Sequence, residues 1–189
     1  MKCRPLPIVA SAIFSLDTHV DARGTFSRAW CRKDGPLNAL PFEIAQINIS
    51  SNPSKGTLRG LHYQRHPHAE QKLVYCIQGT IHDVILDLRP DSPTYLQWVS
   101  VTLSHKTPQA LYIPAGCAHG FQTLEDDTTL LYLISEYYTP SASSGIRYDD
   151  PAFGIEWPLP VSALSERDQQ WIPFQGNADV SDNPAHSSK

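Results

Sequence analysis

Short runs of alternating apolar and polar residues recur along most of the chain. In residues 43–50 the alternation places Gln46 and Asn48 on one face of a predicted strand and Ile47 and Ile49 on the other. Comparable runs predict further strands at 6–16, 25–30, 57–64, 72–77, 80–88, 96–103, 109–113, 119–124 and 128–136. The strand at 25–30 is expected to pair with the strand at 6–16. A Gln-Gly turn is expected to join 72–77 and 80–88 as a hairpin. Short strands at a spacing of about 8–12 residues indicate an all-β antiparallel barrel or sandwich.

Helical signals are confined to residues 160–170, where Ser162 or Ser165 could cap a short helix with Glu166 in its first turn. Residues 32–40 are polar and interrupted by proline, which predicts a loop or a short helix. Residues 177–189 are rich in Ser, Asp, Asn, Pro and His, which predicts a flexible C-terminal tail. Of the 189 residues, 41% are hydrophobic, so residues 1–176 can build the core of a single domain.

Composition and charge narrow the class of protein. A formal net charge of -4 gives no general reason to expect a nucleic acid or a membrane as partner. The apolar run at 8–14 is bounded by Pro7 and Asp17, which favours a strand over a secretory signal, and no run reaches the ~18 residues of a membrane helix. The four cysteines show no Cys-x-x-Cys spacing, and Cys76 lies in an apolar strand where a small core residue is expected. We therefore expect a cytoplasmic protein.

Two stretches carry the candidate chemistry. His62 and Gln64 share one face of a predicted strand, Lys72 stands seven residues before Gly79, and a Pro-x-Gly-x-x-His sequence ends at His119. This arrangement resembles the paired motifs of the cupin barrels, whose metal-binding members have two His, a Glu and a His at these positions. Gln64 and Lys72 replace two of the four ligands, and an ammonium group repels a divalent cation.

One interpretation is a cupin whose site has decayed into core. However, a lysine on the strand face of Val74 and Cys76 is costly to bury without a purpose. We therefore favour a site without metal or cofactor in which Lys72 supplies the positive charge.

A wider set of motifs resembles the dTDP-4-dehydrorhamnose 3,5-epimerase family from about residue 8 to residue 174. The motifs are Asp21-x-Arg-Gly-x-Phe26, Arg59-Gly-Leu-His-Tyr-Gln64, Gln71-Lys-Leu-Val74, Asp87-Leu-Arg89, Ser92-Pro-Thr-Tyr95, Ile113-Pro-x-Gly-x-Ala-His-Gly-Phe121, Asp149-Asp-Pro151, Ile155-x-Trp-Pro158 and Leu164-Ser-x-x-Asp168. The resemblance implies a metal-free cupin jelly-roll barrel that forms a homodimer. It also implies an isomerase that inverts carbon 3, carbon 5 or both in a nucleotide-linked 4-keto-6-deoxyhexose.

The resemblance also implies a role for each matching residue. The catalytic set is His62 as general base, Asp168 as its carboxylate partner, Lys72 at the C4 oxygen of the sugar and Tyr132 as proton donor. Substrate contacts fall to Arg59, Gln46 and Asn48, to Arg23 and Phe26 from the second subunit, and to His119, Asp83 and Tyr138 in the pocket wall.

These residue types suit the chemistry. A proton next to a ketone is removed by a histidine that a carboxylate holds in one tautomer, and the resulting enolate needs a fixed cation at its oxygen. Without the resemblance, Tyr132 would be read as a core aromatic and Asp168 as a surface carboxylate. Arg59 could be a surface charge, although a nucleotide diphosphate favours a phosphate ligand.

Four positions depart from the family pattern. Arg28 and Ser143 stand where the family has Glu, Tyr75 replaces an Arg, and Cys117 replaces a Phe. They leave open the sugar, the nucleotide and the number of carbons inverted. Two other functions share the scaffold: a sugar-nucleotide 3,4-ketoisomerase and a non-catalytic sugar-binding cupin. A metal-dependent oxygenase is disfavoured by Gln64 and Lys72.

Overall fold

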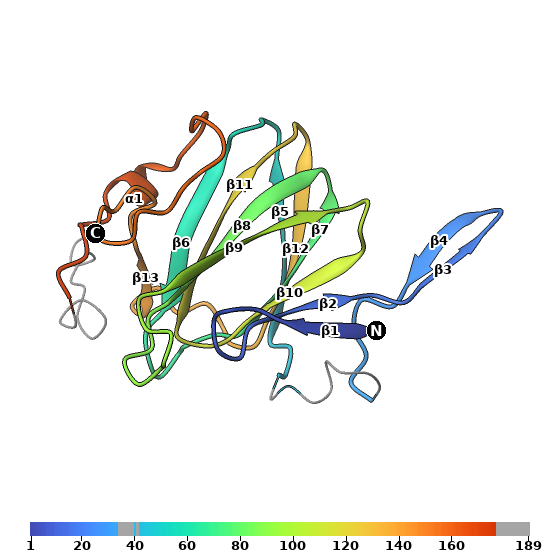
Figure 1. Ribbon diagram of the computed structural model, residues 1–189, viewed down its shortest axis with the longest axis horizontal. Helices are drawn as coiled ribbons and strands as arrows, with labels where there is room; N and C mark the ends of the chain where they lie inside the picture. The colour runs from blue at the N-terminus through green and yellow to red at the C-terminus, as the bar shows by residue number, and fades with distance from the viewer. Residues whose placement is uncertain (34–39, 41, 177–189) are drawn as a thin grey trace.

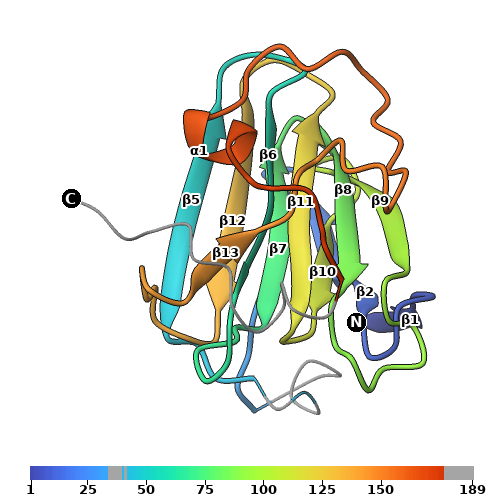
Figure 2. The same ribbon diagram turned by 90° about the vertical axis from the view of Figure 1, so that its left-hand side faces the viewer.

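The computed structural model describes residues 1–33, 40 and 42–176, and all but two of the strands in these ranges form two facing antiparallel sheets (Figures 1 and 2). The first sheet has the order β1 (Lys2–Pro5), β2 (Ala12–Ser15), β10 (Gln109–Ile113), β7 (Lys72–Gln78), β12 (Thr128–Ile134) and β5 (Gln46–Asn52). The second has the order β13 (Ser143–Gly145), β6 (Leu58–Gln64), β11 (Cys117–Thr123), β8 (Thr80–Asp87) and β9 (Trp98–Ser104). From β5 to β8 and again from β10 to β13, successive strands alternate between the two sheets, which is the connectivity of a jelly roll.

The core lies between the sheets because each strand turns alternate residues inward. On β8, Ile81 and Ile85 join the interior cluster, whereas Val84 and Leu86 pack on the outer face of the same sheet. The N-terminal segment covers the outer face of the first sheet through residues such as Phe42. The C-terminal segment covers the outer face of the second sheet through residues that include Phe153, Trp157 and Phe174.

The predicted hairpin between 72–77 and 80–88 is wrong, although both strands exist. β7 pairs with β10 and β12, whereas β8 pairs with β9 and β11, so the chain changes sheets at Gly79. Gly79 has φ +78°, and a Cβ built there would meet Thr128 Oγ1 at 2.3 Å, so the crossing requires glycine. The alternation of residues identifies a strand with two packed faces, but it does not identify the sheet to which that strand belongs.

The N-terminal prediction also needs correction. Residues 6–16 are not one strand, because the chain turns between Leu6 and Ser11 and β1 pairs back on β2. Residues 25–30 do not pair with that region. Instead, β4 (Gly24–Ser27) pairs with β3 (Thr18–Asp21) in a separate two-stranded hairpin, which projects away from the barrel in Figure 1.

The helix at the C-terminal end is confirmed. α1 (Glu166–Gln169) begins after Ser165, whose hydroxyl accepts the Asp168 backbone N–H at 3.1 Å. The expected tail at 177–189 and most of the expected loop at 32–40 lie outside the described residues, so the proposed domain limits stay predictions. No helix in the described ranges is long and apolar enough to cross a membrane.

Candidate active site

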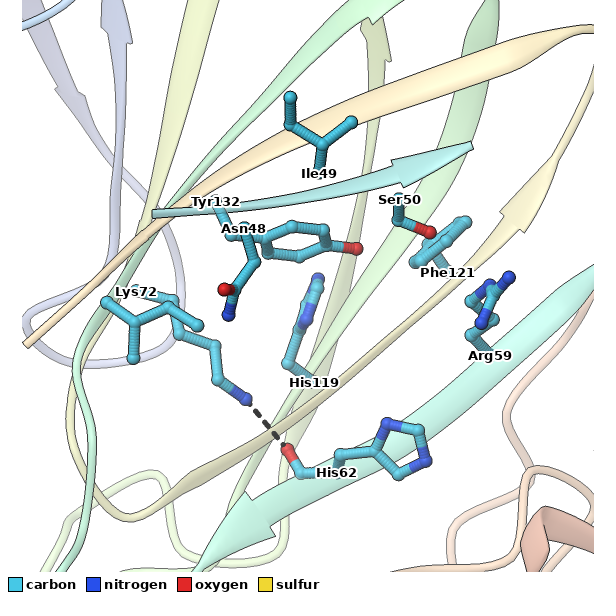
Figure 3. Close-up of a pocket in the computed structure, with 10 residues that line it drawn as sticks. Asn48, Ile49, Ser50, Arg59, His62, Lys72, His119, Phe121 and Tyr132 are labelled. Carbon is cyan, nitrogen blue, oxygen red and sulfur yellow. Dashed lines mark hydrogen bonds between the residues drawn. The ribbon is translucent and has the colours of Figure 1, made fainter. Parts of the chain in front are cut away.

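A cavity of about 250 Å³ opens between the two sheets, and polar side chains from both sheets line it (Figure 3). β5, β7 and β12 form one wall, and β6 and β11 form the other. The lining residues are Asn48, Ile49, Ser50, Arg59, His62, Lys72, His119, Phe121, Tyr132 and Ile134. Six residues named from the sequence as site residues are therefore brought together: Asn48, Arg59, His62, Lys72, His119 and Tyr132.

His62 forms a hydrogen-bonded pair with a buried carboxylate. His62 Nε2 lies 2.6 Å from Asp168 Oδ1, and the two side chains are 41% and 3% exposed. Asp168 also accepts the backbone N–H of Gly60 and the indole N–H of Trp171, each at 3.3 Å. Burial alone would raise the pKa of Asp168, but these hydrogen bonds, led by that of His62, hold it below its usual range. The carboxylate is therefore ionised and can fix the His62 ring.

The Lys72 ammonium lies in the cavity wall and contacts two acceptors. Nζ donates to the His62 carbonyl oxygen at 3.1 Å (Figure 3) and pairs with Glu70 Oε1 at 3.0 Å. Both side chains of this ion pair are less than 10% exposed. The sequence did not single out Glu70, because it precedes β7 in a segment without periodicity. Its one available signal was its position two residues before a lysine expected to be buried.

Tyr132 faces the cavity from the sheet opposite to His62. Its ring meets that of His119 edge to face, with ring centroids 6.1 Å apart. Burial, and then the negative charge of Asp83, raise the pKa of Tyr132 well above its ordinary value, and the opposing effect of Arg59 is smaller. The phenol therefore keeps its proton at neutral pH.

His119 and Asp83 form a second buried pair. His119 Nε2 lies 2.8 Å from Asp83 Oδ1, and both side chains are almost fully buried. His119 is also the direct cross-strand partner of His62 in the pairing of β11 with β6. His119 lines the cavity, whereas Asp83 lies behind it and is not a lining residue, so the predicted contact of Asp83 with substrate stays a prediction.

Arg59 is oriented by a neutral side chain that the sequence did not single out. Its Nε donates to Asn52 Oδ1 at 2.7 Å, and the buried Asn52 amide donates to the carbonyl oxygens of Ser50 and Thr128, each at 3.2 Å. Because an amide carries no net charge, this contact orients the guanidinium without neutralising it.

Besides Asp83, four predicted substrate contacts do not line the cavity of the single chain. Gln46 Oε1 accepts the backbone N–H of Tyr138 at 2.7 Å, and the Tyr138 side chain is exposed. Arg23 and Phe26 lie on the β3–β4 hairpin, where they are 90% and 69% exposed. Their predicted contacts with substrate remain predictions.

Three of the departures from the family pattern have defined surroundings. The Ser143 hydroxyl accepts Arg167 Nη2 at 2.7 Å, and the buried Tyr75 hydroxyl donates to the Ala29 carbonyl at 2.6 Å. Cys117 is buried beside Asp87, and burial raises the pKa of its thiol to about 12. Arg28 lies exposed just beyond β4.

The residues at the cupin ligand positions do not suit a metal ion. The Gln64 amide is fully engaged, since its oxygen accepts Thr139 N–H at 2.6 Å and its nitrogen donates to the carbonyls of His68 and Tyr137. Lys72, on the facing sheet, adds a positive charge. Among the described residues, no group of three or more His, Cys, Asp or Glu side chains is placed to hold a metal ion.

Known proteins resemble this chain over most of its length. The family model described as dTDP-4-dehydrorhamnose 3,5-epimerase matches residues 5–176. The curated dTDP-4-dehydrorhamnose 3,5-epimerase of Sinorhizobium fredii is 43% identical over 149 residues, which cover 78% of this chain and 76% of the relative.

Solved structures agree with the family match. The dTDP-4-dehydrorhamnose 3,5-epimerase of Bacillus anthracis, with TDP and PPi bound, has a TM-score of 0.88 at 35% identity and covers 92% of this chain and 99% of its own. A 3'-monoepimerase from Streptomyces bikiniensis, in complex with dTDP-quinovose, has a TM-score of 0.81 at 33% identity, with 89% and 86% covered. This likeness confirms the predicted cupin jelly roll. The matched family model spans nearly the whole chain, and the chain therefore belongs to the dTDP-4-dehydrorhamnose 3,5-epimerase family.

Proposed function

We propose that this chain inverts carbon 3, carbon 5 or both in a nucleotide-linked 4-keto-6-deoxyhexose, by removing and returning a proton next to the C4 ketone. The observation that carries the proposal is the placement of His62 and Tyr132 on opposite walls of one cavity, with Lys72 between the same two sheets. Inversion requires a base and an acid on opposite faces of the sugar, and this arrangement supplies both.

His62 acts as the base through its Nδ1 atom. In the neutral ring, Nε2–H donates to the ionised Asp168, which leaves the lone pair on Nδ1. When Nδ1 takes the proton from carbon, the electron pair of the broken C–H bond moves towards the ketone and forms an enolate. Asp168 then stabilises the imidazolium, so proton removal does not leave an uncompensated positive charge.

The enolate oxygen is stabilised by Lys72, and Tyr132 completes the inversion. A preorganised cation at an oxyanion lowers the barrier more in a site that excludes water than in solution, and the Lys72 side chain is almost fully buried. Tyr132 then donates its hydroxyl proton to the carbon from the face opposite to His62, which is possible because its raised pKa keeps it protonated.

The remaining cavity residues suit a nucleotide diphosphate. The contact of Arg59 with the neutral Asn52 does not compensate its positive charge, and a guanidinium is well suited to phosphate oxygens. A dTDP-linked sugar is the substrate class that the names of the relatives favour. Both one-carbon and two-carbon epimerases occur among those relatives, so the number of inverted centres is left to experiment.

The site is proposed to be completed in a homodimer. The β3–β4 hairpin carries Arg23 and Phe26 away from its own barrel, and Val20 on the same hairpin is 75% exposed (Figure 1). Such apolar exposure favours a protein partner, and a second copy would receive Arg23 and Phe26 at its cavity. The absence of a nucleic-acid partner and the cytoplasmic location stay predictions.

Solvent exchange tests the function. The protein is incubated with dTDP-4-keto-6-deoxyglucose in D2O, and NMR locates deuterium in the sugar. An epimerase incorporates deuterium at C3, C5 or both and inverts those centres. A product with the ketone at C3 would indicate a 3,4-ketoisomerase instead, and an unlabelled, unchanged sugar would indicate a binding protein.

The site is also proposed to work without metal. The engaged Gln64 amide and the Lys72 ammonium occupy two of the four cupin ligand positions. Exchange by protein treated with EDTA should therefore equal exchange by untreated protein. A loss of activity in EDTA that one divalent ion restores would refute this part of the proposal.

A further inference from the structure

Glu70 lies behind Lys72, outside the set of residues that line the cavity. Its carboxylate pairs with Lys72 Nζ at 3.0 Å and is only 8% exposed. Among the described residues, no other cation pairs with Glu70, and its second carboxylate oxygen is buried without a hydrogen bond. A buried carboxylate that served the fold would be expected to bind backbone N–H groups, as Asp150 does with Ala152 and Phe174. The contacts of Glu70 therefore point to Lys72.

The two contacts of Lys72 also limit where its ammonium can point. An ammonium group has three N–H donors, one of which is directed to the His62 carbonyl and one to Glu70. Because both acceptors are groups of the protein itself, the His62 carbonyl on β6 and the Glu70 carboxylate just before β7, the third N–H is the one left for the cavity that Lys72 lines. The lysine stem is flexible, so an anchor on each side of the head restricts it to one direction.

We propose that Glu70 is a positioning residue for proton removal, which places a counter-charge beside the buried Lys72 ammonium and aims its third N–H at the C4 oxygen of the sugar. The inference rests on the proposed function. Glu70 itself touches neither the substrate nor the reacting carbon. The electron pair released when His62 takes the proton forms the enolate, and Lys72 donates a hydrogen bond to its oxygen without any further group being consumed.

The charge of Glu70 matters as well as its position. An unpaired ammonium buried this deeply would bear most of the free-energy cost of desolvation. A carboxylate at 3.0 Å offsets part of that cost. In Glu70→Gln an amide of the same shape takes the place of the carboxylate, so the counter-charge is removed with little change in packing.

The test is a double-mutant cycle of Glu70→Gln and Lys72→Gln, read by deuterium exchange into dTDP-4-keto-6-deoxyglucose. Glu70→Gln is expected to lower the exchange kcat by about 10-fold or more while KM changes less than about 3-fold, because Lys72 meets the developing enolate. In the Lys72→Gln background the same change should alter kcat by less than about 2-fold, since Glu70 acts through Lys72. Asp149→Asn, which removes a carboxylate from the exposed Arg147 pair, is the control and should exchange like wild type.

Equal exchange by Glu70→Gln and wild type would overturn the inference, and so would a further 10-fold loss in the Lys72→Gln background. If Glu70→Gln alone does not fold, Glu70→Asp takes its place, because it keeps the counter-charge but shortens the reach of the carboxylate to Lys72 Nζ. The exchange kcat of Glu70→Asp should fall at a nearly unchanged KM, and exchange equal to that of wild type would overturn the inference. Circular dichroism establishes folding for each variant. Failure of the proposed function is distinguishable, because the wild-type protein itself would then not exchange.

Discussion

The hydrogen bond between His62 and Asp168 determines which ring nitrogen is available as a base. An ionised carboxylate can only accept, so Nε2 must carry the proton and Nδ1 must be free. An asparagine at position 168 could instead donate its amide N–H to Nε2. That would place the proton on Nδ1, the atom that has to accept one from the sugar.

Asp168→Asn should therefore lower the exchange rate by about 10²–10⁴-fold with a small change in KM, and His62→Ala should cost more. The double variant should be little worse than His62→Ala alone, because the two residues act as a unit. Steady-state exchange in D2O measures all three. Near-wild-type exchange by His62→Ala would show that another residue is the base.

The roles of Tyr132 and His62 can be distinguished by the position at which deuterium enters the sugar and by whether that carbon is inverted. Tyr132→Phe leaves the base in place but removes the hydroxyl that returns a proton from the opposite face. Deuterium should then enter the recovered starting sugar from the side of His62, while epimer formation falls by about 10²–10⁴-fold. NMR of C3 and C5 after short and prolonged incubation distinguishes these events. If the variant forms epimer at the wild-type rate, the acid is another group, with Tyr138 or water as the next candidates.

At the level of single residues, motif spacing predicted His62, Lys72 and His119, because strand periodicity sets the face of a side chain. Asp168 and Tyr132 were predicted only through the resemblance to a family. Asp168 is 106 positions from His62 in sequence, and only the docking of α1 brings them together. Glu70 and Asn52 were missed because their importance lies in a partner, Lys72 and Arg59 respectively, and pairing is a property of the folded chain.

One buried carboxylate, that of Asp87, stabilises the loop between β8 and β9 through hydrogen bonds. Asp87 accepts hydrogen bonds from the Arg89 guanidinium, the Ser92 hydroxyl and the Thr94 hydroxyl, each at 2.6–2.8 Å. Burial alone would raise the pKa of Asp87, but these bonds outweigh it and lower the pKa from 3.8 to about 2. The lowered pKa means that the ionised carboxylate stabilises the folded state.

This stabilisation should depend on pH in a defined direction. It is fully present above the unfolded-state pKa of 3.8 and is lost as the pH falls towards the folded-state pKa of about 2, and the shift corresponds to about 2–3 kcal/mol. Asp87→Asn should therefore lower the free energy of unfolding by about that amount at pH 7 and by clearly less at pH 3. Urea unfolding at the two pH values measures the difference. An equal loss at both would mean that the charge of Asp87 contributes nothing.

At the level of elements, alternation located the strands from β5 to β12 but not their partners. β7 and β8 each have two packed faces, so their sequences read alike whether they form a hairpin or cross between sheets. The strand predicted at 6–16 was wrong for a different reason. Its apolar run continues through the turn between Leu6 and Ser11, where Ile8 is fully buried, so a count of apolar residues does not detect the break.

At the level of the whole molecule, the sequence predicted the family and the jelly roll because the motifs extend over nearly the full chain, and both predictions are confirmed. The expected enzyme class, an isomerase that acts on a carbohydrate, is that of the family. A single chain does not bring all of the predicted substrate-binding residues to its own cavity. Gln46 and Tyr138 contact each other away from the cavity lining, and Arg23 and Phe26 lie on a hairpin that leaves its own barrel.

Subunit mixing tests whether the hairpin of one protomer serves the cavity of its partner. The His62→Ala variant has a defective cavity and an intact hairpin. The variant that combines Arg23→Ala with Phe26→Ala has an intact cavity and a defective hairpin. In a mixed dimer, one cavity carries both defects and the other carries neither. Random mixing of the two inactive proteins should therefore restore about a quarter of the wild-type exchange rate, because half of the dimers are mixed and half of their sites are intact. If the mixture stays inactive although native mass spectrometry detects mixed dimers, the hairpin serves its own cavity, and a monomer in solution would refute the dimer itself.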